Sequence, residues 1–376
     1  MSPEYTMRKA HEVLKQVTGM EYEVMGELEY YVVSEKDDLF LASDQKGYHE
    51  STPFNKGRDL RALAMKYNAG TGGLIKYGHS EVGNFTKGDL MYEQNEIEFL
   101  PTKMEDAADQ LIIAKWILRT LAYQFGVDLT FAPKITVGKA GSGLHIHTRL
   151  KKGDKNMMIE NGKLTDSALK AIAGYLDLAP SLTAFGNTNP MSYFRLVPHQ
   201  EAPTNICWGD RNRSVLVRVP LGWTSGAGDM LRDANPLEKV EDQDFSGKQT
   251  VEFRCPDGSA DVYLLIAGLA VAVRHGFEMK DALQYAKERY VDVNIFDDAN
   301  KGGADRLSQL PASCYDSALC LEKQRADFEK YGVFAPGLID GLVAGLKKFD
   351  DKTLRQDLGN DEVKIMELVQ KYFYCG

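Results

Sequence analysis

Glutamates separated by one residue are the first feature of this sequence that could do chemistry. Glu27 and Glu29 flank Leu28 within residues 21–34, whose tyrosines and valines predict a strand. Alternate residues of a strand share a face, so both carboxylates point the same way. A solvated strand face is the ordinary explanation of such a pair. A shared divalent cation is the alternative, because hard cations prefer oxygen ligands.

Two histidines repeat this alternation after a glycine-rich turn. His145 and His147 follow residues 141–143, Gly-Ser-Gly, and alternate with Leu144 and Ile146. On a strand the two apolar side chains face the core, and the two imidazoles share the opposite face. Histidines at this spacing could bind a metal or contact phosphate. They could equally be a pair of partly exposed strand histidines.

A third predicted strand carries charge of both signs. Glu252 and Arg254 share one face of residues 249–255, where a cross-strand ion pair on a water-facing sheet is the ordinary explanation.

Acidic residues also alternate along residues 93–98, which follow a His-Ser-Glu segment at 79–81. Carboxylates that faced each other unpaired would repel, and a bound cation would remove that cost. The acids concerned are Glu81, Glu93, Glu96 and Glu98.

Arginines collect in the middle of the chain, at Arg195, Arg213 and Arg218. The guanidinium group suits carboxylate and phosphate because its planar fork binds two oxygens at once. A surface salt bridge explains any single one of them. Several acidic strands together with several arginines predict a site for metal and anions.

The elements that must position these residues alternate irregularly. Such an order predicts an α+β fold rather than a doubly wound parallel sheet. The clearest helix spans residues 102–126, with Thr102 and Glu105 as a capping box and Gly126 as its end. Further helices are predicted at 7–18, 58–67, 166–176 and from about 260 onward, strands at 128–137, 143–150 and 214–219, and a loop at 180–212.

Composition limits the class of protein. The chain has 376 residues, 43% of them hydrophobic, and a net charge of −9, which argues against a general nucleic-acid binder. The five cysteines form no CxxC pair, and the first residues carry no apolar signal segment. The longest apolar stretch, residues 262–273, is too short to span a bilayer. We therefore expect a cytoplasmic protein that binds neither nucleic acid nor membrane.

Taken in order, these segments resemble the catalytic domain of glutamine synthetase. The resemblance implies a curved, largely antiparallel sheet flanked by helices, forming one catalytic domain over residues 1–376 with a helical portion at 310–376. The matching segments are GELEYYV, KGYHESTPFNKGRDLR, HSEVG with QNEI, FAPK with GSGLHIH, SYFRLVP with EAP, NRSVLVRVP and VEFRCPD.

The resemblance implies an ATP-dependent ligase that phosphorylates the side-chain carboxylate of glutamate and then lets an amine, or ammonia, displace the phosphate. It also implies at least two Mg²⁺ or Mn²⁺ ions. Glu29, Glu81 and Glu96 are expected to hold one ion. The other is expected at Glu27, His145 and Glu252.

Roles toward the substrates follow from the same resemblance. His147 and Arg218 are expected to contact the phosphates of ATP. Glu201, on a flap, is expected to shield the acyl phosphate from water and to accept a proton from the amine. Tyr48 either lines the amine pocket or is an ordinary loop tyrosine. Glutamate and the transferring phosphoryl group are expected to lie against Arg195, Arg213, Arg254 and the backbone of Gly141.

The sequence also departs from the family. A small N-terminal β-domain usually precedes this region and supplies, from a neighbouring subunit, the acid that attracts ammonium; here the match begins almost at Met1. The acceptor amine therefore stays open, and a catalytically inactive binding or regulatory subunit is the alternative function. A homo-oligomer is expected. Altered positions include Lys76, Ala140, Arg149 and Thr250, and Glu93 could replace Glu81 as a ligand.

Overall fold

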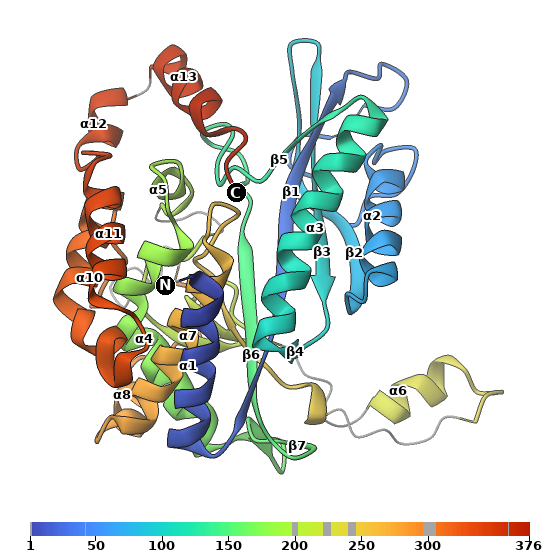
Figure 1. Ribbon diagram of the computed structural model, residues 1–376. Helices are drawn as coiled ribbons and strands as arrows, with labels where there is room; N and C mark the ends of the chain where they lie inside the picture. Colours follow the sequence, from blue (N-terminus) through green and yellow to red (C-terminus); the bar gives the residue numbers. More distant parts are fainter. Residues whose placement is uncertain are drawn as a thin grey trace.

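A curved mixed sheet forms the centre of the molecule (Figure 1). The computed structural model describes residues 2–41, 43–197, 202–220, 227–239, 246–295, 306–359 and 361–376. Within them the main sheet has ten strands, and its principal path runs β10–β11–β12–β6–β1–β3–β2. The strands of the main sheet are β1 Glu21–Glu35, β2 Ile75–Lys87, β3 Leu90–Phe99, β4 Thr102–Lys103, β5 Asp128–Thr130, β6 Leu144–Lys152, β7 Lys155–Asn156, β10 Trp208–Asp210, β11 Val217–Val219 and β12 Val251–Phe253. β8 Ile159–Glu160 and β9 Lys163–Leu164 pair in a separate two-stranded sheet.

The neighbouring strands pair antiparallel, apart from the parallel pair β10–β11. The expected α+β class with a largely antiparallel sheet is therefore confirmed. The helices are α1 Pro3–Thr18, α2 Arg58–Gly70, α3 Met104–Phe125, α4 Asp166–Gly186, α5 Ser192–Arg195, α6 Ala227–Ala234, α7 Val262–Glu278, α8 Ala282–Glu288, α10 Cys314–Glu329, α11 Pro336–Lys347, α12 Leu354–Leu358 and α13 Glu362–Tyr372, with short 3₁₀ turns at Ser246–Lys248 and Lys330–Gly332.

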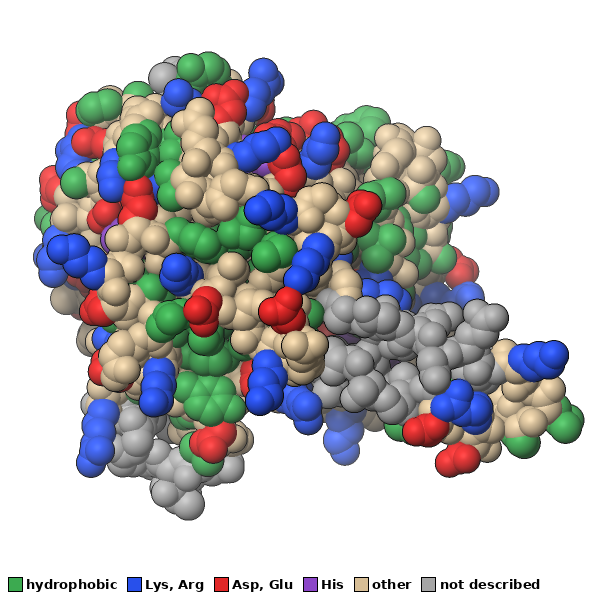
Figure 2. Space-filling model, turned by 90° about the horizontal axis from the view of Figure 1, so that it is seen from below, with side chains coloured by type: hydrophobic (Ala, Val, Ile, Leu, Met, Phe, Trp, Pro, Cys, Tyr) green, Lys and Arg blue, Asp and Glu red, His purple; other side chains and the backbone are tan. Residues whose placement is uncertain are grey.

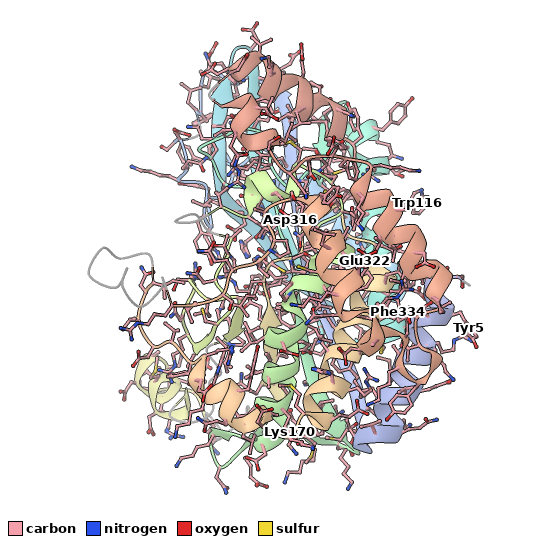
Figure 3. All side chains as sticks on the ribbon, turned by 90° about the vertical axis from the view of Figure 1, so that its left-hand side faces the viewer. Tyr5, Trp116, Lys170, Asp316, Glu322 and Phe334 are labelled. Carbon is pink, nitrogen blue, oxygen red and sulfur yellow. The ribbon has the colours of Figure 1, made fainter. Side chains whose placement is uncertain are left out.

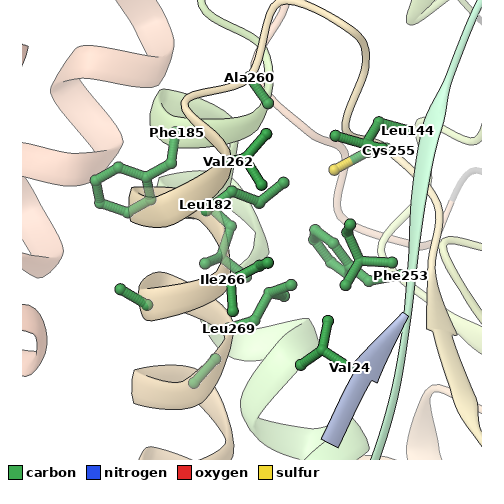
Figure 4. Packing of buried hydrophobic residues seen from close by; sticks show 14 of the residues in the cluster. Val24, Leu144, Leu182, Phe185, Phe253, Cys255, Ala260, Val262, Ile266 and Leu269 are labelled. Atoms are coloured by element: carbon green, nitrogen blue, oxygen red, sulfur yellow. The ribbon is translucent and has the colours of Figure 1, made fainter. Parts of the chain in front are cut away.

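The core lies between one face of the sheet and helices α4 and α7. Figure 4 shows Val24, Leu144 and Phe253 from three neighbouring strands facing side chains of these helices. Leu28, Leu144 and Ile146 are fully buried, so the apolar alternation does set the core face as predicted. The alternate residues of the same strands must then face away from this core, toward the functional site.

Helices α4 and α7 pack with unusually close backbones. A Cβ atom added at Gly174 would lie 1.9 Å from the carbonyl oxygen of Ala272, and one at Gly276 would lie 1.9 Å from that of Lys170. Only glycine fits at these two crossing points. The helix pair thereby forms a rigid support beneath β6 and β12.

Two predicted helix boundaries are wrong. α3 begins at Met104 and lacks the predicted capping box, because Thr102 pairs with Val24 in a strand and the Glu105 carboxylate contacts His11 instead. α4 continues past residue 176 to Gly186, although residues 180–186 were expected in a loop. That extension is buried on nearly all sides against α7 and α10, so it has no amphipathic period from which a helix could be predicted.

The predicted strand at 128–137 is also too long, since β5 ends at Thr130. The end of α3 agrees with the prediction, because Gly126 adopts the left-handed conformation that terminates the helix. Residues 192–195 and 208–210, expected in a loop, form α5 and β10.

The C-terminal helices α10 to α13 line one side of the molecule (Figure 1), and α10, with Asp316 and Glu322, stands in front in Figure 3. Phe334 packs beneath them against Phe185 and Phe328. α6 projects from the body, and basic and acidic side chains are interspersed over the face that Figure 2 shows.

Among the described helices, none is by itself long and apolar enough to cross a membrane. The α7–α8 pair passes that test only jointly and is bent by 110°.

Candidate active site

The strand order brings acids and imidazoles from distant segments onto one face of the sheet. β1 lies between β6 and β3. In register, Glu27 of β1 pairs with His145 on one side and with Glu98 on the other. One strand further, Glu252 of β12 pairs with His147 of β6. The alternation seen in each separate strand thus becomes a continuous polar surface.

The first group on this surface is the Glu252 cluster, which comprises Glu27, His145, His147 and Glu252. Nδ1 of His145 lies 3.1 Å from Oε2 of Glu27 and 3.6 Å from Oε1 of Glu252. Nε2 of His147 lies 2.9 Å from Oε1 of Glu27 and 3.9 Å from Oε2 of Glu252. Glu252 is fully buried, which contradicts the alternative of a water-facing ion pair.

The second group is the His79 cluster, which comprises His79, Glu81, Glu96 and Glu98. Nδ1 of His79 lies 3.7 Å from Glu81, and Nε2 lies 3.7 Å from Glu96 and 3.8 Å from Glu98. The imidazole stacks against the rings of His49 and Tyr77 and is only 7% exposed. Its surroundings therefore hold it in place beside three carboxylates.

Sequence reasoning did not assign His79 or Glu98 a role. Both offer atoms to groups whose geometry could hold a metal ion, namely His79 with Glu81 and Glu96, and Glu27 with Glu96 and Glu98. The signal was the same alternation: His79 stands two residues before Glu81, and Glu98 two residues after Glu96.

Glu29 lies between the two clusters. One of its carboxylate oxygens accepts hydrogen bonds from the backbone N–H of Gly143, at 2.5 Å, and from the side-chain amide of Gln94, at 3.2 Å. The other oxygen lies 4.0 Å from Nε2 of His145. The carboxylate that was expected to share an ion with Glu81 and Glu96 is thus held mainly by the glycine-rich turn.

Glu93, the alternative to Glu81, faces elsewhere. Its carboxylate accepts backbone N–H bonds from Lys56 and Gly57 at 2.9 to 3.1 Å. Because Glu96 lies three positions after Glu93 along β3, and side chains alternate between faces, the two carboxylates occupy opposite faces of the sheet. Of these two candidates, the geometry brings Glu81 and not Glu93 to the cluster.

Burial and crowding perturb the acids of both clusters. Burial, followed by the negative charges of Glu27 and its neighbouring glutamates, raises the pKa of Glu96 well above its usual range. Burial also opposes ionisation of Glu27, yet the adjacent imidazoles of His147 and His145 hold its pKa well below the usual range. A cation at Glu96 would have to displace a proton.

The donor set fits a divalent ion. Nε2 of His147 and Oε2 of Glu252 are both buried without a hydrogen-bond partner, although Nη1 of Arg218 lies 3.1 Å from that oxygen. Buried polar atoms are normally satisfied, so such orphaned atoms call for an explanation. A cation bound between them would satisfy both, and the carboxylate oxygens around it are ligands that suit Mg²⁺ and Mn²⁺.

Two arginines are fixed beside the clusters by backbone carbonyl groups. The guanidinium of Arg195 donates to the carbonyl oxygens of Cys255, at 2.8 Å, and Pro256, at 3.2 Å. That of Arg254 donates to Oε1 of Glu252, at 3.0 Å, and to the carbonyl of Arg213. Such anchoring orients guanidinium groups toward an anion with little loss of side-chain entropy on binding.

Two further arginines lie at the mouth of the site. Arg213 is exposed and lies over the ring of Tyr48, 5.9 Å from its centroid. The hydrogen bond with Tyr48 raises the pKa of this guanidinium. Arg218 lies across Glu252 and is partly exposed, so it combines one buried partner with access to the cleft.

These groups line a single cleft of about 2170 Å³. Acids of β1 to β3, both histidines of β6 and the arginines named above line it, as does Gly141. The carbonyl of Gly141 accepts a hydrogen bond from Gln94, and a Cβ atom there would lie 2.4 Å from the carbonyl oxygen of Pro133. The cleft is large enough for a nucleotide together with a smaller substrate.

Comparison with known proteins decides the family. Residues 1–366 match the glutamine synthetase catalytic domain. The chain belongs to the glutamine synthetase family. A glutamine synthetase from Thermococcus kodakarensis is 30% identical over 362 residues, which cover 95% of this chain and 73% of the relative. One from Mycolicibacterium smegmatis is 32% identical over 302 residues, covering 79% of this chain and 56% of the relative.

The fold of the family is equally evident from solved structures. The Plasmodium falciparum glutamine synthetase superposes with a TM-score of 0.73 at 20% identity, covering 94% of this chain and 77% of that one. At 20% sequence identity this structural similarity is evidence for the fold alone. It agrees with the sheet and flanking helices described above.

Three positions at which this sequence departs from the glutamine synthetase pattern have defined contacts. Lys76, expected to be acidic, pairs with Glu98 at 2.5 Å and lies over the ring of Tyr77. Thr250, expected to be arginine, contacts Nδ1 of His147 through its hydroxyl at 3.0 Å. Arg149, expected to be serine, pairs with Glu23 and donates to the carbonyl of Gly247.

The flap of the glutamine synthetase pattern falls at residues 198–201, which lie outside the described residues. The expectation for Glu201 stays a prediction.

Proposed function

We propose that the protein is an ATP-dependent ligase that forms a γ-glutamyl amide from glutamate and ammonia or another amine, through γ-glutamyl phosphate. The observation that carries the proposal is the pair of acidic clusters lying beside anchored arginines in one cleft. Family membership supports it independently.

The clusters are proposed to hold two Mg²⁺ or Mn²⁺ ions. Glu29, Glu81 and Glu96 would hold one ion, and Glu27, His145 and Glu252 would hold the other. Bound there, the ions would neutralise phosphate charge during an in-line transfer.

Arginines act on the substrates in this proposal. Arg195 and Arg254, held by backbone carbonyls, orient the carboxylates of glutamate, and Arg218 reaches the phosphates of ATP. Arg213, at the mouth of the cleft, stabilises the charge on the transferring phosphoryl group. Holding both reactants in one geometry converts the encounter into an effectively unimolecular reaction.

The reaction proceeds in two displacements. A side-chain carboxylate oxygen of glutamate attacks the γ-phosphorus of ATP, and ADP leaves. The nitrogen of the amine then attacks the acyl carbon, the carbon–oxygen bond to phosphate breaks, and phosphate departs. The proton lost by the amine is assigned to Glu201.

A catalytically inactive binding or regulatory subunit is the second candidate. The ion pair between Lys76 and Glu98 motivates it, because a cation stands where the family resemblance expects an acidic contact to the nucleotide. Calorimetry separates the two: an inactive relative binds glutamate or metal without consuming ATP.

Phosphate release tests the ligase directly. The full chain is incubated with ATP, Mg²⁺ or Mn²⁺ and glutamate, with ammonium and a panel of amines added one at a time. We expect release that requires both glutamate and at least one amine. If no amine gives phosphate release that depends on glutamate, the proposal is wrong. Light scattering on the same sample tests the expected homo-oligomer.

A further inference from the structure

Helix α6, Ala227–Ala234, is short and amphipathic, and it lies outside the core. Every side chain from residue 229 to residue 239 is exposed, and Met230 and Leu231 are 57% and 45% exposed. Ala234 follows them by four and three positions, so these three residues share one side of the helix, and its charged residues lie on the other. A helix of this length is only marginally stable by itself, so its apolar side needs a surface to pack against.

The apolar side of α6 faces the cleft. The residues of α6 that line the cleft are Met230, Leu231 and Ala234, which are the three residues of that side. Leu237, three residues past the end of the helix, is fully exposed and is not part of the cleft lining. Although α6 projects from the body (Figure 1), it therefore presents its apolar side chains to the site.

A second apolar surface in the cleft continues the sheet face that carries the acidic clusters. We call it the Leu100 surface; it comprises Met25, Leu74 and Leu100, which all line the cleft. Met25 precedes Glu27 by two positions on the same face of β1, and Leu100 follows Glu98 by two positions. The cleft thus changes from acidic to apolar within about 7 Å, the length of two strand residues.

The Leu100 surface is fixed in place but is not covered. The backbone N–H of Leu100 donates to the carbonyl oxygen of Leu74 at 2.7 Å, which holds the two residues together. Their side chains are nevertheless 42% and 44% exposed. Half-exposed leucines on a fixed backbone beside a functional site are typical of the apolar part of a ligand pocket.

The groups next to these surfaces suit a polyanion. The chain enters the α6 segment from β11 and leaves it into β12, and these strands pair through Arg218 and Glu252. His147 pairs in strand register with Met25, so the Leu100 surface begins beside the Glu252 cluster. A ligand with phosphates at one end and a flat apolar ring at the other matches this order of groups.

We propose that α6 is one wall of a nucleobase pocket, in which Met230 and Leu231 cover the base of ATP and the Leu100 surface forms the other wall. That the nucleotide is ATP rests on the proposed function. Covering the exposed side chains of both walls removes apolar surface from water, which favours binding of the base. α6 is thereby a specificity element for the nucleotide, separate from the residues that hold metal and phosphate.

Calorimetry of the full protein with Mg²⁺ tests the proposal with two ligands. One is the ATP analogue that has nitrogen between the β- and γ-phosphorus atoms, and the other is tripolyphosphate, which has no base. We expect the double variant Met230→Ser/Leu231→Ser to weaken the analogue at least about tenfold and to change tripolyphosphate affinity less than about twofold. Leu237→Ser makes the same chemical change outside the cleft and should leave both affinities at the wild-type value.

An analogue affinity in the double variant equal to that in Leu237→Ser would overturn the proposal. Equal weakening of both ligands would also overturn it, because the effect would not depend on the base. A double variant with unchanged affinity but altered molar mass by light scattering would assign the apolar side of α6 to a contact between subunits instead. The substituted side chains are exposed, so thermal unfolding without ligand should be similar in all these variants.

The second wall is tested by Leu100→Ser. We expect the same selective loss, at least about fivefold for the analogue and less than about twofold for tripolyphosphate. Unchanged affinity for the analogue would remove the Leu100 surface from the pocket and contradict the proposal.

Trypsin cleavage gives an independent measurement on the unmodified protein. Arg232 lies on the charged side of α6, and its side chain is 43% exposed. We expect the ATP analogue to slow cleavage after Arg232 at least about fivefold, since a helix packed on a ligand unfolds less often, while tripolyphosphate should not slow it. The same cleavage rate with and without the analogue would contradict the proposal.

These measurements need neither glutamate nor an amine, so the pocket and the ligase can fail separately. Analogue binding that depends on α6, without phosphate release for any amine, supports the pocket and contradicts the ligase. Glutamate-dependent release together with wild-type analogue affinity in the double variant contradicts the pocket and leaves the ligase. A wild-type protein that does not bind the analogue would contradict both.

Discussion

Glu27 pairs in strand register with His145, yet its Oε1 lies 2.9 Å from Nε2 of His147, two residues further along β6. The carboxylate therefore spans both imidazoles. It also contributes to the group that contains Glu96 and Glu98. One glutamate thus connects the Glu252 cluster with the His79 cluster, and its charge influences both.

Replacement of Glu27 by Gln is expected to weaken Mn²⁺ binding at both clusters rather than at one. Binding at one hundred times Kd stabilises a folded protein by about 2.7 kcal/mol, so the Mn²⁺-dependent rise in Tm should largely disappear. The matched control is Glu35→Gln, at the exposed end of the same strand. A rise in Tm that matches the control would show that Glu27 is not part of a metal site.

Glu96 makes the metal-free protein sensitive to pH. Its pKa is raised in the folded state by burial and by neighbouring carboxylates, from an ordinary value of 4.5. Below that value Glu96 is protonated in both states. As the pH rises, the unfolded state ionises first, and stability falls by up to about 1.4 kcal/mol per pH unit until folded Glu96 also ionises.

Urea unfolding in EDTA from pH 4.5 upward measures this slope. Glu96→Gln should remove that part of the decline in stability with rising pH. Added Mn²⁺ should restore the stability of the wild-type protein, because the ion displaces the proton from Glu96. A wild-type slope identical to that of the variant would contradict the raised pKa.

Glu81 and Glu93 are expected to separate metal binding from stability. Glu81→Gln should weaken Mn²⁺ at the His79 cluster at least about tenfold, because Glu81 contributes a ligand atom there. Glu93→Gln should leave Mn²⁺ affinity nearly unchanged but destabilise the fold by roughly 1–3 kcal/mol, since buried N–H groups of Lys56 and Gly57 lose a charged acceptor. Calorimetry measures the Mn²⁺ affinity of both variants, and urea unfolding measures their stability. Weakened Mn²⁺ binding in Glu93→Gln together with unchanged binding in Glu81→Gln would contradict the prediction.

A side chain at Gly143 would displace two groups of the site. A Cβ atom there would lie 2.5 Å from Nη2 of Arg195 and 2.8 Å from Nε2 of His145. We expect Gly143→Ala to lower kcat/KM about a hundredfold by displacing both groups, with modest loss of stability. Gly345→Ala, in the exposed part of α11 with no atom within 4 Å, is the control and should retain activity. Wild-type kinetics in Gly143→Ala would contradict the tight packing at this turn.

The sequence predicts which face of each strand is polar, but not which side chains of neighbouring strands come into contact. The alternation at Glu27, His145 and Glu252 follows from the pleat alone. The contacts of His145 with Arg195 and of His147 with Thr250 arise only in the folded sheet. Register between β1, β3 and β6 is a long-range property, so Glu98 and His79 could not be placed from their own strands.

Helices show the same limit. The end of α3 at Gly126 was predictable because a local conformation dictates it, whereas the second half of α4 was not. Burial of the second half of α4 against other helices stabilises it even though Pro180 lies inside the helix. The local sequence has no periodic pattern that predicts this extension.

The central claim is that the cleft phosphorylates glutamate, and positional isotope exchange tests it without knowledge of the amine. ATP carrying ¹⁸O in the β–γ bridge is incubated with the protein, Mg²⁺ or Mn²⁺, and glutamate. Reversible transfer of the γ-phosphoryl group lets the β-phosphate of bound ADP rotate, so the label moves to a non-bridging position. We predict exchange that requires glutamate and divalent metal. Absence of glutamate-dependent exchange in protein that binds the metal would contradict the account.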